Sequence, residues 1–318
     1  MDPVEAAEAK KVAGNTALKA GEVDKAIALY TEAIELNKNE GMFTNRAVAY
    51  IQKRKYKEAL FDCEQALYLN PRFAKAHVRA YACNLAQGLL PKARDSLERA
   101  VELGEAAMAD KLVFIDELVK YEGFVKGAIK RKEYREAVFY SKKLLEHCQD
   151  SVRHIKMRIK SAMLHSPNDL SEIIKLTYDV QNKFMDSAVF LFWRGRVLLY
   201  NNQTDLGKKH IKQALQIDPD NTKIMRFWKM IQKQENLKGS AGAAFKNNLF
   251  EVAAGLFGQC LELDPLNGAF NQALYYNRAC AHHKLGWHDK AMEDCEAAIA
   301  LNPDYAKAYL KKGDIKMD

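Results

Sequence analysis

The sequence lacks any stretch suited to entering or crossing a membrane. Its first fifteen residues alternate charged and small side chains and contain no apolar core for a secretory signal. No window comes near the about 18 consecutive apolar residues that indicate a membrane-spanning helix. We therefore expect a protein with neither a signal segment nor a membrane partner.

Glycine and proline are scarce, at 16 and 7 of 318 residues, and the alternation of apolar and polar residues that marks strands is nearly absent. The apolar fraction of 48% is ordinary for a folded protein. A chain of 318 residues exceeds one ordinary hydrophobic core. Either several domains or a repeat array is therefore expected, built mainly from helices.

Cysteines are few and unpaired in the sequence, with no Cys-x-x-Cys motif. Five of the six lie within alanine-rich or amphipathic helical runs, where small buried thiols are common. This use of cysteine favours a reducing compartment, so we predict a cytoplasmic protein, with the nucleus as a second location. The six are Cys63, Cys83, Cys148, Cys260, Cys280 and Cys295.

Catalytic and metal-binding motifs are also missing. There is no phosphate-binding Gly-x-x-x-x-Gly-Lys-Ser/Thr, no Gly-x-Ser-x-Gly and no His-Glu-x-x-His. His282 and His283 are adjacent, so on a helix they point to different faces and make a poor metal pair. Trp193, Trp228 and Trp287 fit packing positions better than stacking platforms. We predict no enzyme activity, no cofactor and no metal; turnover by the purified protein would reverse this.

The formal net charge of +8 is moderate for a protein of this size. It favours acidic partners through long-range attraction. No aromatic-rich basic motif of a nucleic-acid module and no zinc-finger spacing accompanies it. We therefore predict acidic protein partners and no nucleic acid, a prediction that salt-sensitive gel shifts would test.

An internal repeat organises the chain. Ala26, Ala59 and Ala93 occupy matching places in three similar segments that follow one another at a regular spacing. Near the other end, the segment at 301–308 nearly repeats the segment at 69–76. A period of about 34 residues, with small residues where helices cross, is typical of tetratricopeptide (TPR) repeats.

The repeat predicts how its helices pack. Ala26, Ala59 and Ala93 would let paired helices approach closely, while Tyr30, Phe61 and Leu97 would fill the space beside them. Four prolines would end one unit and open the next helix at its first turn. They are Pro71, Pro219, Pro265 and Pro303.

The fold class that follows is all-α, a right-handed TPR superhelix of about eight to nine helix-turn-helix repeats. We predict three blocks: residues 1–104 with three regular pairs, a degenerate middle at 105–235, and a last block at 236–318. A long helix is expected over residues 222–247, and residues 307–318 read as a first helix without its partner. Because a solenoid normally ends in a polar cap, we expect the sequence to be part of a longer chain.

Five polar residues recur at equivalent places of the first three repeats. Lys11 and Asn15 lie four apart and share a helical face, as do Lys75 and Arg79, while Asn45 lies on the helix between them. Stacking of the repeats would bring all five to one groove. Lysine and arginine only donate hydrogen bonds and an ionised carboxylate only accepts them, so the groove fits an acidic peptide end.

This residue set resembles the carboxylate clamp of heat-shock co-chaperone TPR domains. In that family Lys, Asn, Asn, Lys and Arg hold the C-terminal Glu-Glu-Val-Asp tail of heat-shock proteins 70 and 90. The resemblance implies that Lys11, Asn15 and Asn45 hold the terminal carboxylate and that Lys75 binds the aspartate side chain. Arg79 would reach a backbone or second acidic group. We call these five residues the N-terminal clamp.

The last block carries a partial copy of this pattern. Gly242 stands where the first asparagine belongs, and a lysine replaces the arginine. Glycine removes a donor and lysine cannot make the forked contact of arginine, so we expect weaker or redirected binding there, or a purely structural role. The residues of this C-terminal partial clamp are Lys238, Asn277, Lys307 and Lys311.

The whole layout, including the segment from Phe192 to Pro219, resembles the TPR region of J-domain-containing (DnaJ homologue subfamily C) proteins. A J domain needs a His-Pro-Asp loop, which is absent, and the segment 165–169 is not such a loop. The resemblance implies a co-chaperone adaptor that binds heat-shock protein 70 or 90 tails and client proteins. The alternative is a general scaffold for non-chaperone partners, which should ignore a Glu-Glu-Val-Asp tail.

Overall fold

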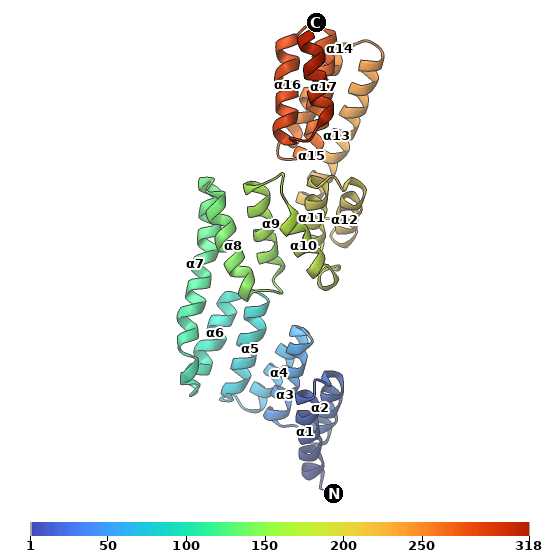
Figure 1. Ribbon diagram of the computed structural model, residues 1–318. Coiled ribbons are helices and arrows are strands. Elements are labelled where there is room, and N and C mark those ends of the chain that lie inside the picture. Colours follow the sequence, from blue (N-terminus) through green and yellow to red (C-terminus); the bar gives the residue numbers. More distant parts are fainter. Residues whose placement is uncertain (1, 318) are drawn as a thin grey trace. The chain divides into compact units, whose positions relative to one another are not determined.

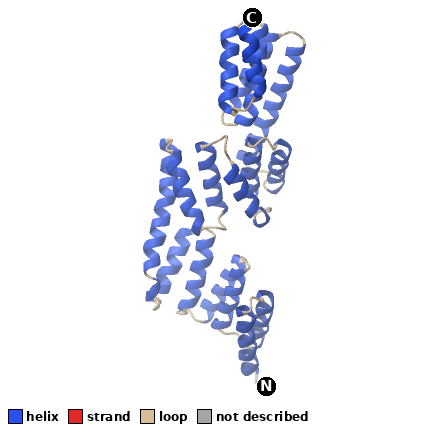
Figure 2. Ribbon diagram, viewed as in Figure 1, coloured by secondary structure: helices blue, strands red, loops and turns tan. Residues whose placement is uncertain are grey.

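The computed structural model describes residues 2–317, and within that range every regular element is helical (Figure 2). These residues form seventeen α-helices, arranged as eight consecutive pairs followed by one further helix. The predicted all-α repeat fold of eight to nine units is thereby confirmed. The long helix expected over 222–247 is α13 (Thr222–Lys246), and the unpartnered last helix is α17 (Ala306–Met317).

The described chain divides into two compact units. The first comprises residues 2–131 and 139–154, and the second comprises residues 132–138 and 155–317, so α8 (Tyr134–His147) contributes to both. The predicted division into three blocks is based on the regularity of the repeats, whereas these two units are defined by compactness. The three-block division therefore stays a prediction.

The first three pairs belong to the first unit and occupy the blue and cyan part of the ribbon (Figure 1). Each consists of two helices of similar length joined by a short turn. They are α1 (Pro3–Lys19), α2 (Val23–Leu36), α3 (Glu40–Gln52), α4 (Tyr56–Leu69), α5 (Ala74–Ala86) and α6 (Leu90–Glu102).

The later pairs are less uniform in length, from the ten residues of α10 to the 25 of α13. Helix α7 belongs to the first unit, and the elements from α10 onward belong to the second. The remaining bounds are α7 (Asp110–Arg131), α9 (Val152–His165), α10 (Ser171–Val180), α11 (Ala188–Tyr200), α12 (Thr204–Ile217), α14 (Phe250–Leu263), α15 (Gly268–Lys284) and α16 (His288–Leu301), with short 3-10 helices η1 (Ala106–Met108) and η2 (Gln181–Lys183).

A single left-handed residue makes the turn within seven of the eight pairs. The first pair uses Gly21, with φ of 79°, and the next uses Arg54, with φ of 58°. Residue 21 donates its backbone N–H to Leu18 and the following residue donates to Ala17, which closes the end of α1. Glycine adopts this conformation without strain, whereas arginine does not. The α9/α10 pair has no such residue within the described chain.

Small residues lie where the two helices of a pair cross. Gly195 and Gly207 face each other across α11 and α12, because a Cβ on either would approach the other's carbonyl oxygen to 2.8 Å. Buried alanines occupy the corresponding places of α3/α4, at Ala47 and Ala59. Close approach of this kind leaves no room for larger side chains, as the repeat pattern predicts.

The space beside these crossings is filled by Tyr30 and Leu97, both fully buried, as expected. Phe61 is different: 56% of it is exposed, so the prediction that it fills the core is wrong. The equivalent place, one repeat after Tyr30 and one repeat before Leu97, belongs to Cys63, which is 1% exposed. Helix α4 therefore places Cys63 inward, and Phe61, two positions earlier, faces away.

The four inter-repeat prolines lie outside the helices. Pro71 precedes the first residue of α5 by three positions, and Pro303 precedes α17 by three. The same spacing holds for Pro219 and Pro265. The prediction that they occupy the first helical turn is therefore wrong. They lie in the preceding turn, where a fixed φ and a missing N–H cost no helical hydrogen bond.

A buried polar pair recurs between the first and second helix of three repeats. Arg46 donates to Asp62 through Nε (2.9 Å) and Nη2 (2.7 Å). Arg278 and Asp294 make the same forked contact at 3.0 and 2.6 Å. In α11/α12 the arginine is Arg194, but its partner sixteen residues later is a histidine.

His210 is a poorer partner for a buried arginine than a carboxylate. Arg194 Nε donates to His210 Nε2 at 3.4 Å, and its Nη1 donates to Thr177 Oγ1 at 3.0 Å. Burial and the nearby Arg194 charge lower the pKa of His210 below its usual 6.5. A protonated His210 could no longer accept this bond and would repel the guanidinium.

Replacing His210 with aspartate should stabilise the second unit by about 1–2 kcal/mol, because Arg194 gains a charged acceptor. The histidine's lowered pKa means that its neutral form supports folding above about pH 6.5 and that stability is lost below it. Wild-type stability should therefore fall more steeply than that of His210→Asp between pH 7.5 and 5.5.

Urea unfolding followed by tryptophan fluorescence measures this selectively. All three tryptophans, Trp193, Trp228 and Trp287, lie in the second unit. Other histidines in that unit titrate equally in both proteins, so only the difference in pH dependence reports on residue 210. Equal slopes for the two proteins would contradict the assigned role of His210.

Candidate functional site

The first helices of the first three pairs lie in series. Helix α1 packs against α3, and α3 packs against α5. Each predicted clamp residue lies on one of these three helices. The repeat therefore positions the five side chains on neighbouring helices, as its period requires.

Asn15 and Asn45 are in direct contact. The Nδ2 of Asn45 donates to the Oδ1 of Asn15 at 3.0 Å, and the hydroxyl of Tyr30 donates to the same oxygen at 2.8 Å. The oxygen of Asn15 is thus occupied, while its Nδ2 has no acceptor within residues 2–317. Asn15 therefore presents a fixed and free hydrogen-bond donor.

Tyr30 is a part of this arrangement that the sequence analysis assigned only to packing. It is fully buried, and burial raises the pKa of its hydroxyl, so it remains a donor. Gly14 makes room for the ring, since a Cβ there would lie 2.7 Å from Tyr30 Cε1. In the sequence, the glycine directly before Asn15 and the tyrosine fifteen residues after it are the features from which this role of Tyr30 could have been predicted.

Lys11 lies one helical turn before Asn15 and is already paired. Its Nζ contacts both carboxylate oxygens of Glu8, at 2.6 and 2.8 Å, and 26% of its side chain is exposed. An incoming carboxylate would have to share Lys11 with Glu8. The spacing of three residues between them was a readable signal for this ion pair.

Lys75 and Arg79 have no acidic partner. Lys75 is exposed and makes neither an ion pair nor a hydrogen bond within the described chain. Arg79 is half-buried, and its Nε lies out of contact with solvent without any acceptor. A guanidinium N–H buried without an acceptor is costly, and an anionic ligand would relieve that cost.

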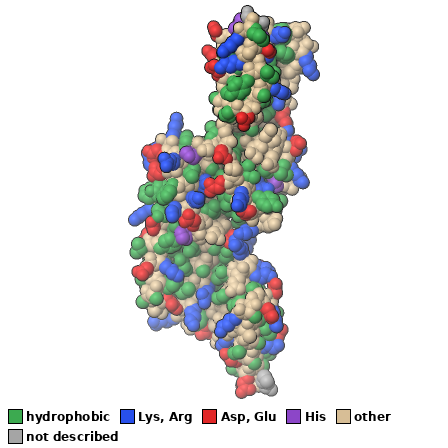
Figure 3. Space-filling model, in the orientation of Figure 1, with side chains coloured by type: hydrophobic (Ala, Val, Ile, Leu, Met, Phe, Trp, Pro, Cys, Tyr) green, Lys and Arg blue, Asp and Glu red, His purple; other side chains and the backbone are tan. Residues whose placement is uncertain are grey.

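Several nearby cations of the first unit are neutralised instead. Lys10 pairs with Glu32 at 2.5 Å, and Arg54 pairs with Asp150. On the face seen in Figure 3, basic and acidic side chains are interspersed rather than separated. Net charge alone therefore does not mark the site; the unpaired state of Lys75 and Arg79 does.

The residues of the C-terminal partial clamp differ from one another in their interactions. Lys238 lies over the ring of Phe270, with Nζ 5.0 Å from the centroid, and Lys311 pairs with Asp314 at 2.9 Å. Asn277 is half-buried and Lys307 exposed, and neither has a polar partner in the described range.

Open space surrounds the position of Gly242. A Cβ built there would meet nothing within 4 Å, so the missing asparagine is a matter of sequence and not of crowding. With one donor absent and Lys311 held by Asp314, this set offers fewer free donors than the N-terminal clamp. Both sets stay predictions as binding sites.

The described residues contain no group of three or more His, Cys, Asp or Glu side chains that could hold a metal ion. Among the same residues, no helix combines the length and apolar character that crossing a membrane requires. All six cysteines are free thiols, and burial raises the pKa of Cys63 to about 12.

Comparison with known families identifies the repeats. Two family models, both described as tetratricopeptide repeat, match residues 12–40 and 188–221 in one case and 42–73 and 273–305 in the other. These segments coincide with pairs α1/α2, α11/α12, α3/α4 and α15/α16. The chain therefore carries tetratricopeptide repeats, and that prediction is confirmed.

Among curated proteins, the chain is similar to DnaJ homolog subfamily C member 7 of Homo sapiens, with 28% identity over 98% of the chain and 63% of the relative. The Schizosaccharomyces pombe homolog of that protein is 26% identical over 96% of the chain and 59% of its own length. The predicted resemblance to this subfamily is confirmed. The chain spans about three-fifths of the length of these relatives.

One solved structure shares the fold over the full length. The crystal structure of the P58(IPK) TPR domain covers 98% of this chain and 97% of its own, with a TM-score of 0.59 and 17% identity. At that identity the match supports the helical repeat architecture alone.

Proposed function

We propose that this tetratricopeptide-repeat chain is a non-catalytic co-chaperone adaptor. Its first three helix pairs bind the acidic Glu-Glu-Val-Asp terminus of heat-shock protein 70 or heat-shock protein 90. The remaining repeats contribute surfaces for a second chaperone or for client proteins. Its place of action is the cytoplasm, with the nucleus as a second location.

The observation that carries this proposal is the set of unsatisfied donors on α1 and α5. Asn15 is held by Asn45 and Tyr30, and among the residues that the structure describes its amide N–H groups have no acceptor and Lys75 and Arg79 have no acidic partner. Four or more donors without acceptors match the two carboxylates at the end of a Glu-Glu-Val-Asp chain.

The relatives support the same class of function. Those named above are DnaJ homologs and match almost the whole of this chain, although the chain covers only about three-fifths of their length. Any regulation of a chaperone ATPase belongs to the whole protein and is not part of this proposal. Five of the six thiols are buried, and the raised pKa of Cys63 makes that thiol unreactive, which fits a reducing compartment.

Calorimetric titration of the full chain with a peptide ending in Met-Glu-Glu-Val-Asp tests the proposal. We expect a dissociation constant in the micromolar range, which corresponds to a binding free energy of about −8 kcal/mol. Tighter binding is not expected, because ordering the peptide offsets much of the interaction energy. Amidating the C-terminus removes one carboxylate and should weaken binding at least about tenfold. Affinity should also fall as salt rises.

The matched control is the same peptide with its two glutamates and aspartate changed to glutamine and asparagine. Equal affinity for the free and amidated peptides would sink the clamp assignment. A complete lack of binding to either would favour the alternative of a scaffold for non-chaperone partners.

A further inference from the structure

One face of α13 carries a continuous series of binding-type side chains. Spacings of four, four, three and four residues place five of them in line along the helix. In order they are Lys223, Phe227, Ile231, Gln234 and Lys238. All belong to the second compact unit, away from the N-terminal clamp in sequence.

At the start of this face two cations lie over shared aromatic rings. Arg196 Cζ is 4.8 Å from the ring centroid of Phe227 and 5.0 Å from that of Trp193. Lys223 Nζ is also 5.0 Å from the Trp193 centroid. Trp193 is 4% exposed, so its ring is held in place by packing and can interact with both positive charges.

Positive charge accumulates here, and the carboxylate of Asp264 acts on Arg196 only at a distance and through Tyr200. Partial burial of its ammonium group, followed by the charges of Lys156, Arg196 and Lys160, lowers the pKa of the otherwise exposed Lys223. None of these four cations forms an ion pair with a carboxylate within residues 2–317. Arg196 donates through Nη2 to the hydroxyl of Tyr200 at 3.2 Å, and its buried Nε has no acceptor. Such a group of cations favours an anionic ligand.

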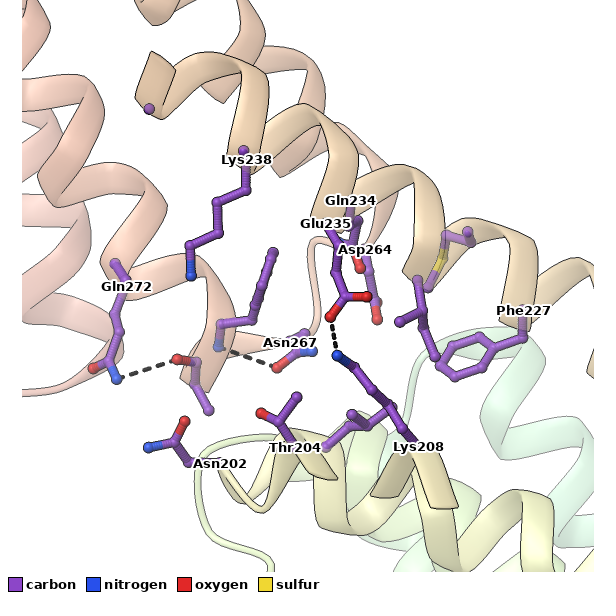
Figure 4. Close-up of a pocket in the computed structure, with 18 of the residues that line it drawn as sticks. Asn202, Thr204, Lys208, Phe227, Gln234, Glu235, Lys238, Asp264, Asn267 and Gln272 are labelled. Atoms are coloured by element: carbon purple, nitrogen blue, oxygen red, sulfur yellow. Dashed lines mark hydrogen bonds and ion pairs between the residues drawn. The ribbon is translucent and has the colours of Figure 1, made fainter. Parts of the chain in front are cut away.

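A pocket of about 730 Å³ opens further along the same face (Figure 4). Gln234 and Asp264 lie on one side of it, and each is more than nine-tenths buried. Within residues 2–317 the Nε2 of Gln234 has no acceptor and the Oδ2 of Asp264 has no donor, although Oδ1 accepts from Tyr200 at 2.7 Å. Among the buried side-chain atoms of the described pocket lining, Gln234 thus presents a free donor, and Asp264 and Gln272 each present a free acceptor, since Oε1 of Gln272 also lacks a donor.

The rest of the pocket wall is largely apolar. At its edge Lys208 and Glu235 pair with each other, as the dashed line in Figure 4 marks. Lys238 points into the space from α13. A volume of this size accommodates several atoms of backbone together with one large side chain. The apolar lining includes Leu199, Phe227, Met230, Ile231, Ala243 and Phe270.

These features together favour a peptide ligand, because a peptide bond supplies both an N–H for Asp264 and a C=O for Gln234. An acidic side chain would satisfy Arg196 and Lys223. An aromatic or aliphatic side chain next to it would fill the apolar pocket. A basic segment would be repelled by the four cations, since of the two carboxylates that line the pocket, Asp264 and Glu235, the second is already paired with Lys208.

The register of the repeat separates this surface from a carboxylate clamp. Helices α11, α12 and α13 begin 148 residues after α3, α4 and α5 (188 versus 40, 204 versus 56, and 222 versus 74). Lys223 thus corresponds to Lys75, but Trp193 replaces Asn45 and Phe227 replaces Arg79. Aromatic rings therefore occupy the positions where a clamp has the amide and guanidinium donors. Because those donors would bind the terminal carboxylate of a peptide, this surface does not need a free chain terminus.

We propose that the face of α13, together with Arg196 and Trp193 of α11, binds an internal acidic peptide segment that carries an aromatic or aliphatic side chain. The partner is another protein, recognised by this chemistry, and the site is independent of the proposed chaperone-tail clamp.

An array of random decapeptides, each acetylated and attached through its C-terminus, tests the site with the full chain. No array peptide offers a free carboxyl terminus, so the N-terminal clamp is not probed. We expect bound sequences to be enriched in Asp or Glu beside an aromatic or aliphatic residue. The best of these, remade with blocked ends, should bind in solution by fluorescence anisotropy.

Arg196→Gln combined with Lys223→Gln should weaken that binding at least about tenfold. Lys223→Gln alone, at an exposed position, should weaken it severalfold without any risk to folding. Arg226→Gln with Lys229→Gln removes the same charge from exposed positions of α13 and serves as the matched control.

The Lys11→Ala, Lys75→Ala variant should bind the array peptides like wild type, which distinguishes this site from the proposed clamp. Preference for basic or uncharged peptides, no binding at all, or unchanged affinity in Lys223→Gln and in the double variant would each overturn the proposal. Tryptophan fluorescence of every variant verifies that the second unit is folded.

Discussion

The full chain with Lys75→Ala and Arg79→Ala should bind a Glu-Glu-Val-Asp peptide at least about 100-fold more weakly than wild type. Each residue supplies charge-assisted hydrogen bonds worth about 1.5–3 kcal/mol, and about 2.7 kcal/mol already corresponds to a hundredfold change. Neither side chain has an acidic partner in the described chain. Their removal therefore takes away binding energy without breaking an internal ion pair.

The matched control is Lys57→Ala with Lys92→Ala. Both lysines are exposed on second helices, α4 and α6, and their loss lowers the net charge by the same amount. Calorimetry should give near-wild-type affinity for this control. If both double variants lose affinity equally, long-range charge and not a local clamp explains the binding.

Lys11→Ala should have a smaller effect than Lys75→Ala. Lys11 is paired with Glu8, so part of its interaction with a peptide replaces an existing contact. Its loss should weaken binding near the lower end of about 1–3 kcal/mol. The order of the two single variants therefore checks whether Glu8 competes with the ligand.

The second large effect should come from Asp62→Ala, which we expect to destabilise the first unit by about 3–5 kcal/mol. Asp62 is fully buried and receives both forked hydrogen bonds of Arg46. Removing it leaves a largely buried guanidinium without a counter-ion, which is much costlier than removing both partners. Arg46 follows Asn45 directly, so peptide binding should also be lost as the unit unfolds.

Two spectroscopic probes distinguish destabilisation of the first unit from destabilisation of the whole chain. The first unit contains no tryptophan, so far-UV circular dichroism should record its earlier urea transition while tryptophan fluorescence of the second unit stays unchanged. Glu64→Ala, an exposed acid two residues away, is the matched control and should be neutral within about 0.5 kcal/mol. An Asp62→Ala protein as stable as that control would refute the importance of the buried pair.

Much of the architecture could be predicted because it depends on local spacing. Alanines one repeat apart predict where helices cross, and Ala59 and Ala93 are indeed fully buried. The bounds of α13 agree with the predicted long helix to within one residue. The periodicity of a helix is fixed by backbone geometry, so it leaves a readable pattern in the sequence.

Details that depend on neighbouring helices were harder to predict. The aromatic Phe61 was assigned to the core, but the register of the repeat places the smaller Cys63 there. The sequence analysis assigned no role to His210, and only its position against Arg194 shows that it replaces an aspartate. The sequence named the clamp residues but not the Tyr30 hydroxyl that fixes Asn15.

The sequence by itself determined the repeat, its helix pairs and the positions of Lys11, Asn15, Asn45, Lys75 and Arg79, because each follows from spacing along one or two helices. The tertiary structure decided which charges are already paired, as Lys11 is, and which are free, as Lys75 and Arg79 are. It also brought Arg196 and Lys223 over Trp193 and opened the pocket along α13. Pairing and enclosure depend on distances between helices, which a linear period does not encode.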